Sequence, residues 1–237
     1  MGEDHGELRD VAAKLQAMLL DSERIEAFLA ELARAAAGAV DAARSCGVTV
    51  SATARRRMLG ATSDGFAARM DAVQYETDDG PCLTCLRSGE PVLVEDIPTD
   101  PRWPEFSRRG EQEGARQSLS VPLLEHGRAV GAVNLYTQRP DVLGPVDRER
   151  AAQFADRAAG AVALAVRLAE QEDRARHLEI ALRSRAQIDQ AVGALMVSLR
   201  VDAAEAFDVL RTRSQNSNTP LRDVAADVLG RLASRRS

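Results

Sequence analysis

Lysine is almost absent from this sequence, and histidines and aromatic residues are few. Lys14 is the only lysine among 31 basic residues, which excludes lysine-based chemistry from residues 15–237. The three histidines, His5, His126 and His177, fall in separate predicted elements, so neither a catalytic triad nor a histidine metal cluster is predicted. We therefore expect a protein that is not an enzyme.

Cysteines are also scarce. Cys46, Cys82 and Cys85 are too few for a disulfide framework and indicate a reducing compartment. The Cys82-x-x-Cys85 pair has no second pair to complete a zinc site, and Cys46 is a poor third ligand. We interpret all three as buried structural thiols and expect no metal or other cofactor. A redox sensor and a thiol enzyme are the alternatives.

The sequence has no long apolar run. The apolar stretch 158–168 is preceded by Arg157 and contains Arg167, and it falls short of the ~20 residues of a membrane-spanning helix. The acidic N-terminus, with Glu3 and Asp4, lacks the pattern of a signal peptide. We expect a cytoplasmic protein that has no membrane partner.

The length of 237 residues suits two domains, and the charge is distributed unevenly between the two ends of the chain. Residues 177–237 carry nine arginines and seven acidic residues, whereas residues 1–176 have a net charge of −7. This basic bias indicates that the C-terminal end faces an anionic partner.

Hydrophobic periodicity predicts helices first and strands afterwards. Helical spacing over 7–40 predicts two amphipathic helices or one kinked helix. Alternation over 46–50 predicts a strand, and the glycines of 60–65 bracket the next turn. Another strand is predicted at 91–94, before a polar, proline-rich loop at 95–104.

Two more strands, 119–124 and 129–136, flank a predicted hairpin turn at Glu125-His126-Gly127. The middle of the chain is therefore expected to form an antiparallel sheet flanked by helices, an α+β fold.

One long connector helix is predicted from Pro145 to Leu199, since no proline and only two glycines follow Pro145 within it. Apolar residues follow steps of three and four, as in a coiled-coil seam: Leu164, Leu168, Ala175, Leu178 and Leu182. Gln171 and Arg185 make this seam imperfect. We expect a homodimer formed through the connector helix.

Two short helices complete a predicted three-helix module at the C-terminal end. Asp202 and Glu205 predict a capping box, and Thr219-Pro220 predicts a cap followed by a first-turn proline. The polar segment 214–218 is expected to form the loop between these helices. Seven apolar residues are predicted to form the core: Leu195, Met196, Phe207, Val209, Leu210, Val224 and Leu229.

This C-terminal module resembles the ANTAR family of RNA-binding antitermination domains. The resemblance is carried by 183–196, 205–211, Ser214, Asn218 and 221–225. It implies a dimer that binds paired hairpins in nascent RNA and favours an antiterminator over a terminator. The lysine that relatives often carry before the glycine of the first helix is replaced here by Val192. The lone Lys14 excludes the receiver domain that some ANTAR proteins carry.

The middle of the chain resembles a GAF domain of the kind that precedes ANTAR in actinobacterial regulators. The residues that carry the resemblance are 79–82, 100–104, 118–123 and 131–136. We divide the chain into a helical extension (1–22), a GAF sensory domain (23–170) and the connector with the ANTAR domain (171–237). Cys82, Arg102 and Trp103 are the residues we expect at a site for a small-molecule or redox signal, although packing of Trp103 under its own loop is the competing interpretation.

The residues expected to bind RNA are arginines, because guanidinium planes can hold unstacked loop bases. With two polar residues, the set is Arg183, Arg185, Arg211, Arg213, Ser214, Asn218 and Arg222. For each arginine alone, a solvated helical face explains the residue equally well. Two other functions stay open: a dimeric signalling adapter that acts through protein partners, and a sulfoxide reductase of the GAF type.

Overall fold

The computed structural model describes residues 25–52 and 57–234. Internal contacts divide the chain into two compact units, Met1–Glu170 and Gln171–Ser237. The predicted helical segment 7–40 lies partly outside the described residues, and α2 (Ile25–Ala39) is its described part.

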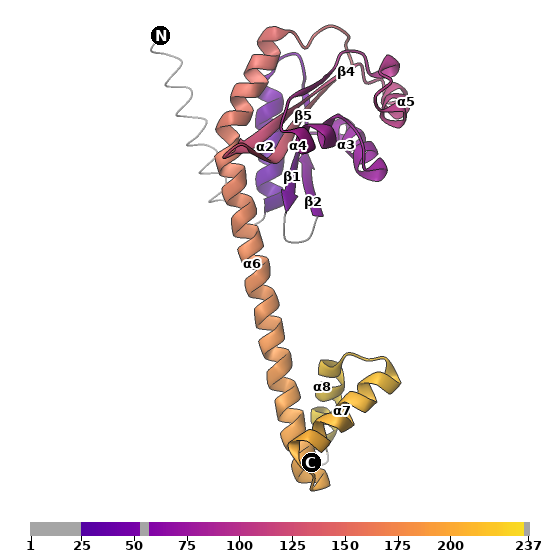
Figure 1. Cartoon of the computed structure of the whole chain (residues 1–237), viewed down its shortest axis with the longest axis vertical. Coiled ribbons are helices and arrows are strands. Elements are labelled where there is room, and N and C mark those ends of the chain that lie inside the picture. The colour runs from indigo at the N-terminus through magenta and orange to yellow at the C-terminus, as the bar shows by residue number, and fades with distance from the viewer. Residues whose placement is uncertain (1–24, 53–56, 235–237) are drawn as a thin grey trace. The chain divides into compact units, whose positions relative to one another are not determined.

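The first unit is built on a five-stranded antiparallel sheet with the order β2-β1-β5-β4-β3, which confirms the predicted α+β class (Figure 1). The strands are β1 (Ser45–Ala52), β2 (Arg57–Thr62), β3 (Val92–Val94), β4 (Gln117–Glu125) and β5 (Arg128–Thr137). The predicted hairpin turn between β4 and β5 is also confirmed. His126 and Gly127 have φ values of 50° and 74°, as a tight two-residue turn requires.

One face of the sheet is apolar. In β1 the alternating residues Cys46, Val48 and Val50 are buried against α2 and the beginning of α6 (Pro145–Leu199). In the register of the sheet Val48 pairs with Val133, and Val121 also pairs with Val133. This face is the larger hydrophobic core of the unit.

The opposite face of the sheet is covered by three short helices (Figure 1). These are α3 (Gly65–Thr77), α4 (Pro81–Ser88) and α5 (Pro104–Gln112), and the 3-10 turn η1 (Ile97–Thr99) precedes α5. The predicted loop at 95–104 therefore contains a helical turn. The predicted turn at 60–65 is displaced, because Gly60 lies inside β2, where a Cβ atom would come within 2.7 Å of the Tyr75 hydroxyl.

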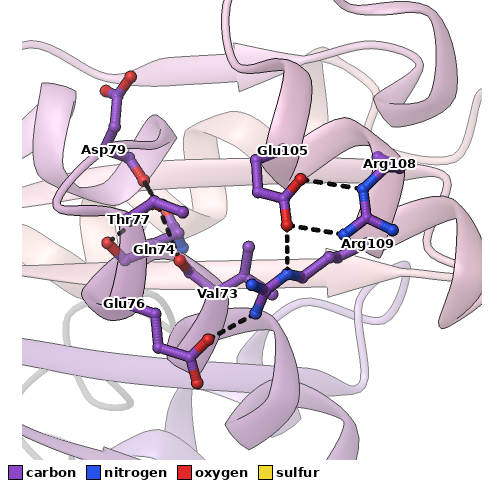
Figure 2. A network of polar contacts seen from close by, with 8 residues as sticks. All are labelled: Val73, Gln74, Glu76, Thr77, Asp79, Glu105, Arg108 and Arg109. Carbon is purple, nitrogen blue, oxygen red and sulfur yellow. Dashed lines mark hydrogen bonds and ion pairs between the residues drawn. The ribbon is translucent and has the colours of Figure 1, made fainter.

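One surface ion pair joins α3 to α5, and two more lie within α5 (Figure 2). Arg109 of α5 contacts Glu76 of α3 at 2.5 Å and Glu105 at 2.6 Å, and Arg108 contacts Glu105 at 2.7 Å. The hydrogen bonds from Arg108 and Arg109 lower the pKa of Glu105 to about 2. Glu105 therefore stays ionised at neutral pH and keeps both arginines in place.

The second unit is a small helical module. It contains the C-terminal part of α6, α7 (Ala203–Ser217) and α8 (Leu221–Ser234). The predicted capping box is confirmed, since Asp202 accepts from the Glu205 amide at 2.9 Å and the Glu205 side chain accepts from the Asp202 amide. Its core consists of seven buried residues: Ala191, Leu195, Ala206, Leu210, Val224, Ala225 and Val228.

Several details of this module differ from the prediction. Phe207 and Val209 are 40% and 43% exposed, and Met196 is 36% exposed, so their assignment to the core is wrong. The core is narrow because α7 buries only Ala206 and Leu210.

The prediction of a loop at 214–218 is also wrong for residues 214–217. Residues up to Ser217 belong to α7, and only Asn218 leaves the helix, with a left-handed φ of 49°. The Thr219 hydroxyl, predicted to cap α8, donates to the Ser217 carbonyl at 3.2 Å.

Candidate functional site

The seven residues predicted to bind RNA are distributed over all three helices of the second unit. Arg183 and Arg185 lie on α6, whereas Arg211, Arg213 and Ser214 lie on α7. Asn218 is the C-cap residue of α7, and Arg222 lies in the first turn of α8. No contact between these three groups identifies them as a single cluster, so their use as one surface stays a proposal.

Each of the five arginines lies near a carboxylate. The pairs are Arg183–Glu179 at 2.6 Å, Arg185–Asp189 at 4.0 Å, Arg211–Asp208 at 2.9 Å, Arg213–Asp227 at 3.0 Å and Arg222–Asp223 at 3.4 Å. The arginine side chains are between 43% and 84% exposed. Ion pairs of this exposure are weak in water, so a phosphate group can replace the carboxylate.

Ser214 and Asn218 shape the end of α7. The Ser214 hydroxyl donates to the Thr219 carbonyl at 2.6 Å, and the Thr219 amide donates to the Ser214 carbonyl at 3.1 Å. Asn218 is exposed beside this turn. Ser214 therefore fixes the chain between α7 and α8, and Asn218 presents an amide that can donate to a phosphate or a base.

A second candidate site lies in the first unit, on the sheet face below α3 and α4. Five side chains of β1, β4 and β5 on this face are polar and buried: Thr49, Ser118, Ser120, Asn134 and Tyr136. We call the following residues the buried polar cluster: Thr49, Asp71, Gln74, Cys82, Asn134 and Tyr136. Only Cys82 among them was predicted from the sequence to be a residue of a ligand site.

Asp71 lies at the centre of the buried polar cluster. Its Oδ1 atom accepts from the Tyr136 hydroxyl at 2.5 Å and from Asn134 Nδ2 at 3.2 Å. Its Oδ2 atom is buried without a hydrogen-bond partner and lies so close to Gly47 that a Cβ atom there would be 2.0 Å away. Burial raises the pKa of Asp71 to about 7, against the lowering effect of the bonds from Tyr136 and Asn134.

The rest of the cluster is held by a chain of hydrogen bonds. Gln74 donates to the Tyr136 hydroxyl at 2.9 Å and accepts from the Cys82 amide at 2.8 Å. Asn134 Nδ2 also lies 3.3 Å from the Thr49 hydroxyl. Residues from β1, α3, α4 and β5 are thus joined, so a change at Asp71 would affect all four of these elements.

The three cysteines are buried free thiols, as the sequence predicts. Burial raises the pKa of Cys82 to about 12 and that of Cys85 to about 12, and the pKa of Cys46 is raised well above its ordinary value. Thiols with such pKa values carry almost no thiolate at neutral pH and react slowly. Within residues 25–52 and 57–234, no group of three His, Cys, Asp or Glu side chains is placed to hold a metal ion.

Arg102 and Trp103, the other two residues predicted at a ligand site, hold their own loop. Arg102 pairs with Asp100 at 2.6 Å, donates to the Leu93 carbonyl at 2.8 Å and stacks over the Trp103 ring at 4.4 Å. Trp103 is buried in the core beneath α5. The side chains predicted to line a ligand site, Cys82, Arg102 and Trp103, are therefore already engaged within the protein.

None of the described helices combines the length and the apolar character that crossing a membrane demands.

Family models assign both parts of the chain. The model of the GAF domain matches residues 22–163, and the model of the ANTAR domain matches residues 176–229. The chain therefore belongs to the GAF domain family. Its order of domains is that of a GAF-ANTAR regulator, in which a sensory domain precedes an RNA-binding antitermination domain.

A GAF domain of known structure shows the same fold. The GAF domain of an Acinetobacter phosphoenolpyruvate-protein phosphotransferase is 14% identical, with a TM-score of 0.50 over 69% of this chain and 98% of that chain. The free methionine-R-sulfoxide reductase of Neisseria meningitidis in complex with its substrate is 19% identical, with a TM-score of 0.48 over 68% and 91%. A comparison with curated protein sequences gives no significant match.

Proposed function

We propose that this protein is a dimeric cytoplasmic regulator of transcription termination that binds paired hairpins in nascent RNA through residues 171–237. The observation that carries the proposal is the ANTAR domain match, whose residues include all five candidate arginines. Arginine side chains that are exposed on three helices can each exchange a carboxylate for an RNA phosphate.

The ion pairs give RNA binding a physical requirement. A phosphate must compete with Asp208 for Arg211 and with Asp227 for Arg213. Each arginine–phosphate contact therefore contributes less binding free energy than a contact made by an arginine that has no carboxylate partner. Affinity for a single hairpin should therefore be modest. A dimer that binds two hairpins on one transcript compensates for this modest affinity, because binding of the second hairpin becomes intramolecular once the first is bound.

Dimerisation is supported by the seam of α6. Four leucines at coiled-coil spacing are between 45% and 68% exposed: Leu164, Leu168, Leu178 and Leu182. Apolar side chains in such a stripe have no partner on a lone helix, and a second copy of the same helix would cover them.

The buried polar cluster is our proposed place of signal reception. A polar sheet face under three short helices holds an unpaired carboxylate oxygen, which a small ligand or a proton can satisfy. A redox signal at Cys82 and the sulfoxide reductase alternative are less well supported, because the thiols are buried and their pKa values are high. Cys82 keeps a structural role in this proposal.

A gel-shift titration of the full chain with a two-hairpin RNA tests the proposal. We expect the two-hairpin RNA to be retained, with an affinity that falls as salt rises because bound phosphates displace counterions. An unstructured RNA of the same length is the matched control. Equal retention of both RNAs, or retention of neither, would favour the adapter that acts through protein partners.

A further inference from the structure

Phe207 is the only aromatic residue, in the sense of Phe, Trp or Tyr, between positions 171 and 237. Its neighbours in the apolar pattern, Ala206 and Leu210, are completely buried, yet Phe207 itself is 40% exposed. It does not belong to the hydrophobic cluster that holds the three helices together. A large ring at the surface of a small module is therefore available for a partner.

The position of Phe207 on α7 places it beside residues already proposed to contact RNA. A helix advances about 100° per residue, so Phe207, Arg211 and Ser214 follow one another along one face at steps of four and three. The Arg211 side chain is 57% exposed, and Asn218 follows where the helix ends. An aromatic face next to a guanidinium group is the combination that holds an unstacked base together with its phosphate.

Val209, the other exposed apolar residue in the middle of α7, lies on the opposite side of the buried stripe. It lines a surface groove together with Val201, Glu205, Asp208 and Arg213. The buried stripe thus separates Val209 from Phe207, which makes Val209 a matched apolar control on the same helix.

We propose that Phe207 is a stacking platform for an unpaired loop base of the RNA hairpin, with Arg211 holding the adjoining phosphate. The inference rests on the proposed RNA-binding function and adds to it a contact that is independent of charge. Stacking on an aromatic side chain tolerates any base, because every base has a π-face. Phe207 therefore contributes affinity for an unpaired loop without selecting its sequence.

The test compares three variants of the full chain in binding to a hairpin RNA: Phe207→Leu, Phe207→Tyr and, as the matched control, Val209→Ala. We expect Phe207→Leu to weaken binding about 10- to 100-fold, because leucine is apolar but offers no flat face. Phe207→Tyr and Val209→Ala should stay within about 3-fold of the unaltered protein. The dependence of affinity on salt should be unchanged in Phe207→Leu, because no phosphate contact is lost.

A second RNA, in which the loop nucleotides lack their bases, completes a double-mutant cycle. The loss of affinity that Phe207→Leu causes with the intact hairpin should disappear with this RNA. Equal affinity of Phe207→Leu and the unaltered protein for the intact hairpin overturns the inference, as does an equal loss on both RNAs. A changed oligomer mass in Phe207→Leu also overturns it and assigns the ring to a protein contact. If the unaltered protein binds no hairpin, the proposed function itself fails, which is a distinguishable result.

Discussion

Asp71 lies at a position of α3 where the helical spacing of the buried residues predicts an apolar side chain. The buried residues of α3 include Ala67, Met70, Asp71 and Gln74, which follow helical steps of three and four. Asp71 is the only charged residue among the buried side chains of the described part of the chain. A carboxylate that is buried without a cation opposes folding when it is ionised, so a carboxyl group at this position calls for a functional reason.

The first prediction is that Asp71→Asn stabilises the protein at high pH. The pKa of Asp71 is about 7 in the folded protein, compared with an ordinary value of 3.8. The folded protein therefore retains a proton that the unfolded chain loses, and stability falls as pH rises from about 4 to about 7. Asp71→Asn removes this loss of stability. For a pKa shift of this size, the loss in the free energy of unfolding amounts to up to about 4 kcal/mol above pH 7.

Urea unfolding of both proteins between pH 4 and pH 8 measures the effect. The stability of Asp71→Asn should change little over this range, whereas that of the unaltered protein should fall. The exposed Asp79, near the end of α3, provides the control as Asp79→Asn. Parallel pH curves for Asp71→Asn and the unaltered protein would show that Asp71 titrates normally.

The second prediction concerns single arginines of the proposed RNA surface. Arg185→Ala and Arg222→Ala should each weaken binding of a two-hairpin RNA and lower the slope of log affinity against log salt by about 1, because one phosphate contact is lost. Arg174→Ala removes the same charge from α6 outside the ANTAR match and should bind like the unaltered protein. Unchanged affinity in both test variants would place the RNA on another surface.

At the scale of elements, the sequence predicted regular structure well where the signal is local. Strand alternation over 46–50, the turn at His126-Gly127 and the capping box at Asp202 depend on neighbouring residues, and all are confirmed. The exposure of Phe207 was not predicted. The helical pattern identifies a stripe of apolar residues on α7, but it does not show how much of that stripe the neighbouring helices bury.

The buried polar cluster was missed for a related reason. Its members come from four elements, and the contacts between them join positions as far apart as Thr49 and Asn134. A sequence signal did exist, since Asp71 and Gln74 fall at buried positions of a helix and Thr49 alternates with Val48 and Val50. Such a pattern indicates a polar residue in a core, but only the fold shows which residues satisfy one another.

The third prediction concerns the start of α7. Asp202→Ala removes the side-chain acceptor for the Glu205 amide and should destabilise the C-terminal module by about 1 kcal/mol. Thermal unfolding followed by circular dichroism would detect this as a lower midpoint for the module. Gln215→Ala, an exposed position near the other end of α7, is the control and should leave the midpoint in place. Equal midpoints for all three proteins would show that the cap does not stabilise α7.

At the scale of the whole molecule, α6 is the one element that the two units share. Residues 171–183 of this helix are exposed on every side, so the described part of the chain provides no packing for the helix there. An isolated helix of that length is only marginally stable in water. A partner helix along the leucine seam would explain both the leucines and the persistence of the helix between the two units.

The last prediction separates the seam from the rest of the helix surface. Leu178→Glu with Leu182→Glu places carboxylates in the seam and should convert a dimer to a monomer, because like charges would face each other in the interface. Ile180→Glu introduces the same charge at a residue that is 49% exposed but lies off the seam, and this variant should stay dimeric. Sedimentation equilibrium measures both masses. The monomer should also lose its preference for two hairpins over one, since only a dimer joins two ANTAR modules. A seam variant that keeps the dimer mass would exclude this stripe as the interface, whereas a monomer that still prefers two hairpins would show that one module contacts both.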